Sequence, residues 1–287
     1  MQEYKELARR VLNDGQYSLD RTGTGTYRVF GAQMKFDCSR YFPLVTIKKT
    51  HFKSIVHELI WFLRGETNTQ YLRDNGVTIW DEWADYRGEL GPIYGAQWRN
   101  AGGSYRTNVT GTWAQDGVDQ IQNAIEQIKN NPSSRRIIVD SYTVAQLPDV
   151  HLSPQENVGV GRMALAPCHM FFQFFVRNDG HLDVQVYMRS VDLFLGLPFN
   201  LASYALLLNI IAKITHLKPG NLIWTGGDVH LYKNHVDQTL EMLKRTALPL
   251  PSIHVNQDLR DINDITFDDI QLSDYQYHSA IKAEISI

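Results

Sequence analysis

Residues 162–200 read RMALAPCHMFFQFFVRNDGHLDVQVYMRSVDLFLGLPFN, and the rest of the chain is organised around this stretch. An apolar, aromatic run at residues 170–176 is followed by Asn-Asp-Gly at 178–180, which is a hairpin-turn signal. Residues 181–187 are therefore predicted to return as a neighbouring strand. A thiol, a guanidinium, a carboxylate and an amide follow at the ends of neighbouring elements, on Cys168, Arg189, Asp192 and Asn200. That arrangement suits an active site.

The thiol of Cys168 has two interpretations. A cysteine beside a histidine is more often a small buried hydrophobe than a nucleophile. Adjacent residues of a strand point to opposite faces, so His169 is not expected to activate Cys168 as a base. Reactive thiols need an electropositive, partly exposed setting, and the nearby Arg189 favours one. A papain-like hydrolase is the generic alternative, but it needs a separate histidine, and its local signature is absent.

The composition is that of an ordered, globular chain of 287 residues, with 43% apolar and 21% charged residues. A net charge of −3 argues against a general nucleic-acid or membrane-surface binder. No apolar run of about 18 residues is present, so no membrane span is expected. Two cysteines, Cys38 and Cys168, and a charged amphipathic N-terminal helix indicate a reducing, cytoplasmic setting. No repeat or linker divides the chain, so residues 1–287 are expected to form one domain.

Outside the central stretch, residues 47–63 are predicted to form a helix, residues 221–225 a strand and residues 148–162 an exposed loop. Glu58 lies in the apolar part of the predicted helix, within HELIWF. The residues alone favour a salt-bridged carboxylate on the surface of the helix. The alternative is a buried carboxylate with a raised pKa and a role in proton transfer.

Two further segments carry chemistry. Arg135 and Arg136 precede a predicted strand, either as a solvated edge or as an anion site, because guanidinium pairs match phosphate oxygens. Residues 80–83 (WDEW) and 91–98 (GPIYGAQW) form an aromatic-rich region. Such regions are usually part of the core, and in some proteins they provide a stacking surface for a flat ligand.

Eight blocks, in order along nearly the whole chain, resemble the thymidylate synthase family. They are DRTGTGT at 20–26, HELIWFL at 57–63, IWDEWAD at 79–85, GPIYGAQW at 91–98, SRRII at 134–138, ALAPCH at 164–169, RSVDLFLGLPFNLASY at 189–204 and TGGDVHLY at 225–232. The resemblance implies an α+β fold, with a mixed twisted sheet covered by helices on one face and packed sheet to sheet in a homodimer. It also implies methylation of deoxyuridylate (dUMP) to thymidylate, with 5,10-methylenetetrahydrofolate as the donor of carbon and hydride. No metal site is expected.

The resemblance implies catalytic roles for five residues. Cys168 matches the thiolate that adds to C6 of uracil and so makes C5 nucleophilic. Asn200 matches the amide that donates to the enolate oxygen and accepts from N3–H. Glu58 matches a carboxylate that moves protons through ordered water. Tyr94 matches a tyrosine implicated in removing the C5 proton, and Asp192 matches a folate-contacting position with a catalytic role.

The resemblance also implies binding roles. Arg21 and Arg189, with Ser190 alongside, match phosphate ligands from one subunit, whereas Arg135 and Arg136 match a pair that crosses from the partner chain. Further implied ligands are Val191, Asp192, Asn200, His230, Leu231 and Tyr232 for the nucleotide, and His51, Trp80, Asp192, Ser286 and Ile287 for the folate. The implied partners are therefore dUMP, folate and a second copy of the chain, without DNA or a membrane.

Three departures separate the chain from the usual family pattern. Met188 stands where the family generally has Gln, residues 141–143 read SYT instead of AWN, and residues 148–162 form a longer connection. Met188 and Tyr142 are features of the pyrimidine-nucleotide hydroxymethylases, in which water rather than hydride completes the reaction. Asn200 favours uracil, because cytosine-specific hydroxymethylases carry Asp there. A deoxyuridylate hydroxymethylase is therefore the alternative. A non-catalytic nucleotide-binding relative would be expected to lose the thiol or the carboxylate, and neither is lost.

Overall fold

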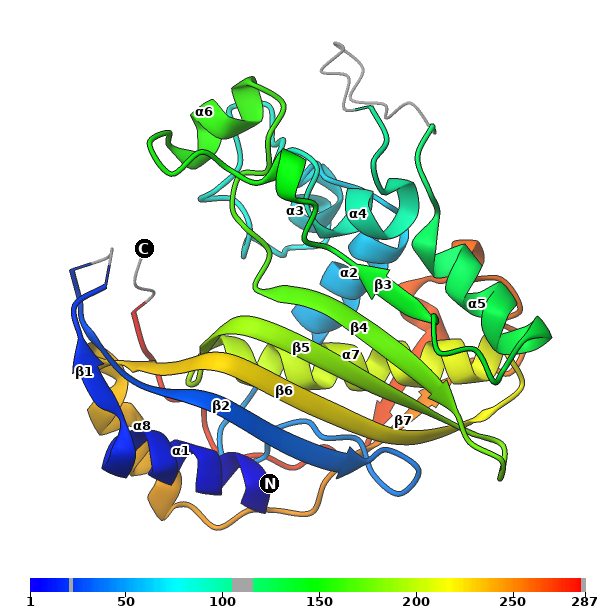
Figure 1. Ribbon diagram of the computed structural model, residues 1–287. Coiled ribbons are helices and arrows are strands. Elements are labelled where there is room, and N and C mark those ends of the chain that lie inside the picture. The colour runs from blue at the N-terminus through cyan, green and yellow to red at the C-terminus, as the bar shows by residue number, and fades with distance from the viewer. Residues whose placement is uncertain (21–22, 105–115, 285–287) are drawn as a thin grey trace.

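The computed structural model describes residues 1–20, 23–104 and 116–284. The fold is centred on a six-stranded sheet, whose order is β1 (Gln16–Ser18), β2 (Thr26–Asp37), β6 (Lys218–Tyr232), β5 (His181–Asp192), β4 (His169–Val176) and β3 (Ile138–Asp140). Neighbouring strands are antiparallel, except that β5 and β6 run parallel. This mixed sheet with its surrounding helices confirms the predicted α+β class (Figure 1).

The hairpin predicted from Asn-Asp-Gly is present as β4 and β5. Gly180 has a φ of 79°, a left-handed conformation that glycine adopts without a steric penalty. Along β4, Phe172 and Phe174 are buried, whereas Phe175 is 63% exposed. The strand therefore places successive rings on opposite faces of the sheet.

The core face of the sheet is covered by α7 (Gly196–Ile214), which packs against β5 and β6. This helix is apolar all round, as expected of a helix enclosed on every side. By length and composition α7 could cross a membrane, but 78% of its apolar window is buried inside the protein. It is therefore a core helix, and its first two turns carry Asn200.

The other α-helices of the described residues are α1 (Gln2–Asp14), α2 (Phe52–Leu63), α3 (Gln70–Asp74), α4 (Tyr94–Asn100), α5 (Gln120–Asn130), α6 (Pro154–Gly159) and α8 (Val236–Lys244). Smaller elements are η1 (Val144–Gln146), η2 (Lys233–His235), η3 (Ile262–Asp264), η4 (Phe267–Asp269) and the ribbon of β7 (Ser252–Val255) with β8 (Ile270–Ser273). Figure 1 shows α2 to α6 gathered beyond the β3–β4 edge, and α1 and α8 at the β1–β2 edge. α2 contacts both α4 and α7, so it connects that group of helices to the core.

The helix predicted for residues 47–63 begins later than expected. α2 starts at Phe52, because the buried residues before it pass through the core as irregular chain. At the start of the helix the imidazole of His51 is 2.7 Å from Ser54 Oγ. An apolar run does not distinguish buried irregular chain from buried helix, which is why the boundary was predicted wrongly.

The strand predicted for residues 221–225 is also longer than expected. β6 runs from Lys218 to Tyr232 and pairs with β2 on one side and β5 on the other. Gly226 and Gly227 do not end it. The ring of Trp224 and the hydroxyl of Tyr187 occupy the space that a Cβ at these positions would need. These glycines therefore permit close packing within a strand, as glycines inside strands often do.

Residues 148–162 are mostly exposed, as predicted, but they are not a loop throughout. They contain α6, which begins with a capping box formed by Ser153 and Glu156. Asn157 is 2% exposed and Val158 is fully buried within the main hydrophobic cluster. This connection is therefore a folded part of the molecule.

The face of the sheet opposite α7 carries large exposed apolar side chains. Those on β2, β3 and β4 are Phe30, Ile138, Phe171 and Phe175. Between them a short polar ladder crosses the sheet, in which the Gln33 and Gln185 amides donate to Thr225 Oγ1 at 3.1 and 3.3 Å. A soluble monomer rarely leaves aromatic rings exposed in this way, so the face has the character of an interaction surface.

Candidate active site

Cys168 lies immediately before β4 and is held by backbone contacts from two other elements. Its amide donates to Tyr94 Oη at 2.8 Å, and its carbonyl accepts from the Arg189 amide at 2.8 Å. Cys168 is partly exposed, whereas Cys38 is 7% exposed. Burial raises the pKa of the Cys38 thiol to about 12, so that thiol stays protonated and unreactive. Of the two thiols, only Cys168 has the exposure that a nucleophile needs.

The guanidinium of Arg189 lies beside the chain that leads to Cys168. Its Nε donates to the Pro167 carbonyl and its Nη2 to the Ala166 carbonyl, both at 2.8 Å. These bonds fix a positive charge next to the thiol-bearing residue. A fixed positive charge favours the thiolate over the thiol, because opposite charges attract more strongly in a partly buried site. The electropositive setting expected for a reactive cysteine is present.

His169 is buried and takes no part in activating the neighbouring thiol. Its ring stacks on Tyr94 with a centroid separation of 4.0 Å, and its Nδ1 is 2.7 Å from Tyr204 Oη. Burial lowers the pKa of His169 to about 3, so the imidazole is neutral at ordinary pH. Burial also raises the pKa of both tyrosines well above their usual value. The result is an uncharged, hydrogen-bonded layer behind Cys168, which sequence reasoning did not predict for His169 and Tyr204.

Glu58 on α2 is half-buried, and its enclosed carboxyl agrees with the second of the two interpretations. Its Oε1 accepts the indole N–H of Trp80 at 2.8 Å. Burial raises the pKa of Glu58 to about 7, against the smaller opposing effect of that hydrogen bond. Its charge also contributes to the raised pKa of Tyr204. A carboxyl with this pKa exchanges protons near neutral pH, which is the property of a general acid or base. The predicted salt bridge on the helix surface was wrong.

Asp192 ends β5 and turns the chain into α7. Its Oδ1 accepts the amides of Phe194 and Leu195 at 2.9 and 3.2 Å. Lys48 lies nearby, 6% exposed, with its ammonium 4.3 Å from the centre of the Phe194 ring. Burial lowers the pKa of Lys48 to about 8, and the Asp192 charge opposes that change. Sequence reasoning did not single out Lys48, because a lysine at the start of a predicted helix gives no sign of burial.

The predicted nucleotide ligands divide into two groups by the direction of their side chains. Ser190, Asn200, His230 and Tyr232 are partly exposed. Val191 and Leu231 are 1% and 0% exposed and belong to the core. Any contact that Val191 or Leu231 makes with a ligand therefore has to come from the backbone.

His230 is part of a charged cluster on the outer face of β6. Its Nδ1 is 3.3 Å from Asp228 Oδ1, and Arg28 Nη1 is 3.1 Å from Asp228 Oδ2. The hydrogen bond from His230 contributes most to lowering the pKa of Asp228. The rings of His230 and Tyr232 meet edge to face at 5.3 Å. In the pairing of β5 with β6, His230 lies beside Asp192, so these groups share one end of the sheet.

A family model described as thymidylate synthase matches residues 2–287. The chain belongs to the thymidylate synthase family. The match covers essentially the whole chain, and the observed mixed sheet agrees with it. Membership in the thymidylate synthase family supports a transferase activity that methylates or hydroxymethylates deoxyuridylate. The resemblance seen in the eight sequence blocks is therefore confirmed.

In this family member, Arg135 and Arg136 lie far from Cys168 within the chain. Both are exposed and precede β3, whose residue Ile138 pairs with Gln173 of β4. Continuing that register backwards places the arginines near the far end of β4, whereas Cys168 precedes its first residue. Seven residues of strand separate those points, which is roughly 23 Å. One chain therefore does not bring these two arginines to its own thiol.

The predicted folate ligands are described in part. His51 is exposed at the start of α2. Trp80 is 8% exposed and contacts Trp61, Phe62, Trp83 and Tyr94 with ring separations from 5.8 to 6.3 Å. Three predicted residues lie outside the described part of the chain, namely Arg21, Ser286 and Ile287.

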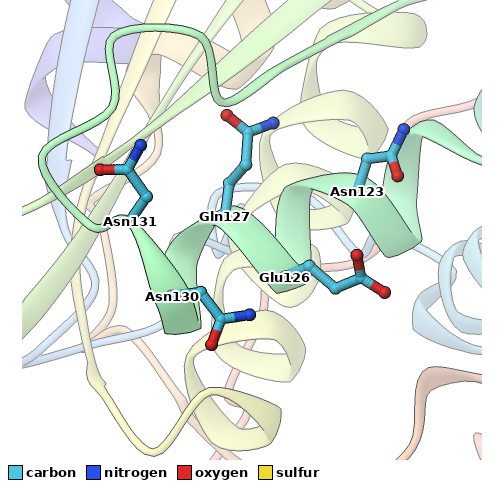
Figure 2. A pocket seen from close by; sticks show the side chains of 5 residues that line it. All are labelled: Asn123, Glu126, Gln127, Asn130 and Asn131. Atoms are coloured by element: carbon cyan, nitrogen blue, oxygen red, sulfur yellow. The ribbon is translucent and has the colours of Figure 1, made fainter.

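A hollow of about 260 Å³ lies on the outer side of α5, away from this site (Figure 2). It is lined by Asn123, Glu126, Gln127, Asn130 and Asn131. These side chains come from one helix and the residue after it, and one of them, Gln127, accepts a hydrogen bond from Ser134 Oγ at 3.0 Å. The hollow contains neither a thiol nor a cationic group, so it is not the candidate active site.

Proposed function

We propose that the protein converts deoxyuridylate to thymidylate, with 5,10-methylenetetrahydrofolate as co-substrate. The observation that carries the proposal is the partly exposed Cys168 beside the guanidinium of Arg189. Glu58, with a pKa of about 7, is connected to it through Trp80 and Tyr94, whose rings are 6.0 Å apart. A nucleophile, a fixed cation and a proton-transfer group are thus joined in one packed assembly.

The first chemical step belongs to the thiolate of Cys168. Its sulfur forms a bond to C6 of uracil, and the electron pair of the C5–C6 double bond moves towards the C4 carbonyl. Negative charge then collects on O4, and C5 becomes nucleophilic. Asn200 donates its N–H to that oxygen and accepts from N3–H with its own carbonyl. After the one-carbon unit is joined to C5, loss of the C5 proton breaks the bond between that unit and the folate nitrogen and leaves an exocyclic methylene. Hydride from the folate then adds to that carbon, and the bond between sulfur and C6 breaks to restore the thiolate.

Proton movement is assigned to Glu58. Its carboxyl donates and accepts protons at neutral pH, because the two forms are similarly populated near its pKa. Tyr94 has a pKa well above its usual value, since burial disfavours the phenolate. We therefore assign Tyr94 a hydrogen-bonding role, as a neutral hydroxyl that orients the proton acceptor at C5.

The folate supplies the one-carbon unit and, for methylation, the hydride. Trp80 and Trp83 are assigned to the border of the folate ring: their indoles pack together at 5.8 Å, and the Trp80 indole donates a hydrogen bond to Glu58. Asp192 suits the polar edge of that ring as an acceptor. These residues bind and orient the folate and exclude water from the reacting carbon.

The active unit in this proposal is a homodimer in which each site is completed by Arg135 and Arg136 of the partner chain. The separation of these arginines from Cys168 supports this, as do the exposed rings of Phe30 and Phe175 on the outer face of the sheet. Each chain is taken as one domain, residues 1–287, because a single hydrophobic cluster runs from Met1 to Ile270. A cytoplasmic location follows from the free thiols and from the nucleotide substrate.

Shared sites predict that two inactive variants restore each other. Cys168→Ser removes the nucleophile, and the double variant Arg135→Ala, Arg136→Ala removes the phosphate ligands. A hybrid dimer purified with two different tags contains one site in which both parts are intact. We expect the hybrid to recover about half of the parent activity, whereas each homodimer alone stays nearly inactive. A hybrid as inactive as its parents would contradict the shared site.

The identity of the product tests the proposed function and its alternative. Met188, buried beside His169 in the strand pairing, accepts a hydrogen bond from Trp224 Nε1 at its sulfur at 3.1 Å. Met188 stands where the family generally has Gln and is a feature of the pyrimidine-nucleotide hydroxymethylases, so it favours the alternative, a deoxyuridylate hydroxymethylase. Incubation with deoxyuridylate and methylenetetrahydrofolate, followed by mass spectrometry, is expected to give thymidylate and dihydrofolate. Hydroxymethyl-deoxyuridylate with tetrahydrofolate would establish the alternative, and the formation of neither product would overturn both.

A further inference from the structure

The segment of residues 148–162, here called the α6 segment, is a folded unit that the proposed reaction does not use. Its shape is set by the buried Asn157. In the Asn157 side chain, Oδ1 accepts the backbone N–H of Asp149 at 2.7 Å, and Nδ2 donates to the Asp149 carbonyl at 3.1 Å. At the other end, the Arg162 amide donates to the Asn157 carbonyl at 2.9 Å. One asparagine thus joins the beginning and the end of the segment.

The α6 segment is attached to the tryptophan segment, residues 79–85 (IWDEWAD). The Gln155 Nε2 donates to the carbonyls of Glu82 and Ala84, at 2.9 and 3.4 Å. These two carbonyls flank Trp83, so one side chain bridges the backbone on both sides of that residue. The Trp83 ring packs against Trp80 at 5.8 Å, with the planes at 65°. The contacts therefore continue from Gln155 to the residue that donates a hydrogen bond to Glu58.

A second attachment lies where the α6 segment returns to the sheet. The Ala164 amide donates to the Leu90 carbonyl at 2.9 Å. Gly91 has a φ of 70°, and the Arg162 carbonyl fills the place that a Cβ would take. Three residues later, Tyr94 accepts the amide of Cys168. The segment is thus fixed against both strips of chain that supply aromatic groups to the candidate site.

We propose that Gln155 is a positioning residue, which holds the tryptophan segment so that Trp80 encloses the folate and keeps water from the exocyclic carbon. The inference deepens the proposed function and rests on it. A tryptophan segment that moves freely would bind folate less tightly and admit water. Water at that carbon gives the hydroxymethyl product in place of the methyl product, so Gln155 influences the ratio of the two.

Three substitutions separate this role from a general loss of structure. Gln155→Glu keeps the size of the side chain but turns its donor into an acceptor that faces two carbonyl oxygens. Gln155→Lys keeps a donor, and is expected to behave like the parent. Gln271→Glu, on the exposed side of β8, is the matched control for the change of charge. The readouts are backbone hydrogen exchange of residues 79–91 in the free protein, KM for each substrate, and the ratio of products.

For Gln155→Glu we expect faster exchange in residues 79–91, a KM for folate raised about fivefold and a larger hydroxymethyl fraction, with KM for deoxyuridylate unchanged. Three results would overturn the inference. They are unchanged hydrogen exchange, an equal rise in the KM values for both substrates, and faster exchange without any change in the folate KM and the products. If the parent makes no thymidylate, the proposed function fails by itself. In that case the comparison of Gln155→Glu with Gln155→Lys still decides whether Gln155 positions the tryptophan segment. The quantities compared are the hydrogen exchange of residues 79–91 and the affinity for folate.

Discussion

Replacing Cys168 by serine is expected to lower turnover by at least about 10⁴-fold, the scale at which removal of a nucleophile disables an enzyme. A hydroxyl ionises far less than a thiol does and its oxygen is a weaker nucleophile than sulfur, so the bond to C6 does not form. Because Cys168 is partly exposed and its backbone bonds do not involve sulfur, the variant is expected to fold normally.

Exchange of the C5 hydrogen of deoxyuridylate with deuterated water isolates the role of the thiol. Addition of sulfur to C6 makes this hydrogen exchangeable without any folate, and the serine variant is expected to lose the exchange as well as turnover. Cys38→Ala is the matched control, since its thiol is buried and protonated, and it should retain both activities. A serine variant that still turns over would exclude covalent catalysis by Cys168.

Replacing Glu58 by glutamine is expected to reduce kcat by about 10²- to 10³-fold, which is typical for loss of a general acid or base. Glutamine keeps the acceptor for the Trp80 indole but cannot exchange protons. The parent kcat should show an ionisation near pH 7 that the variant lacks. A variant with the parent's pH profile would show that another group moves the protons.

The same substitution is expected to change stability in a pH-dependent way. The pKa of Glu58 is raised from 4.5 to about 7, because ionisation is more costly in the folded state. Below pH 4.5 Glu58 is protonated in both the folded and the unfolded state, and the folded state then has its full stability. That stability is lost as the pH rises through 7, where Glu58 must ionise in the folded state. Glu58→Gln should thus be more stable than the parent above pH 7, by on the order of 3 kcal/mol, and equal to it near pH 4.5. Urea unfolding at several pH values measures the difference, and a constant difference would contradict it.

The fold could be predicted where local signals agreed with the tertiary structure. Asn-Asp-Gly at 178–180 identified the β4–β5 hairpin, because a tight turn needs residues that tolerate positive φ. The extent of β6 was missed, since the role of Gly226 and Gly227 depends on how Trp224 of the same strand and Tyr187 of β5 pack against them. For the α6 segment a usable signal existed, namely the Ser-Pro-x-Glu pattern of a capped helix at 153–156.

The candidate site was predicted more completely in its residues than in their surroundings. Chemistry and family resemblance selected Cys168, Arg189 and Glu58, but only tertiary packing decides whether a carboxylate is buried. The same limit applies to Lys48 and to the neutral pairing of His169 with Tyr204, whose pKa shifts come from neighbours remote in sequence. Arg135 and Arg136 could be recognised as anion ligands from their type, yet only the strand register showed how far they lie from the thiol of their own chain.

The contrast between the two cysteines has a practical consequence for work with this protein. Cys38 is enclosed and its pKa is raised to about 12, whereas Cys168 is open to small electrophiles. One equivalent of an alkylating reagent per chain should therefore inactivate a preparation completely. The amount of reagent consumed then measures the number of active chains. For the same reason, oxidation by peroxide is expected to inactivate the protein first at Cys168.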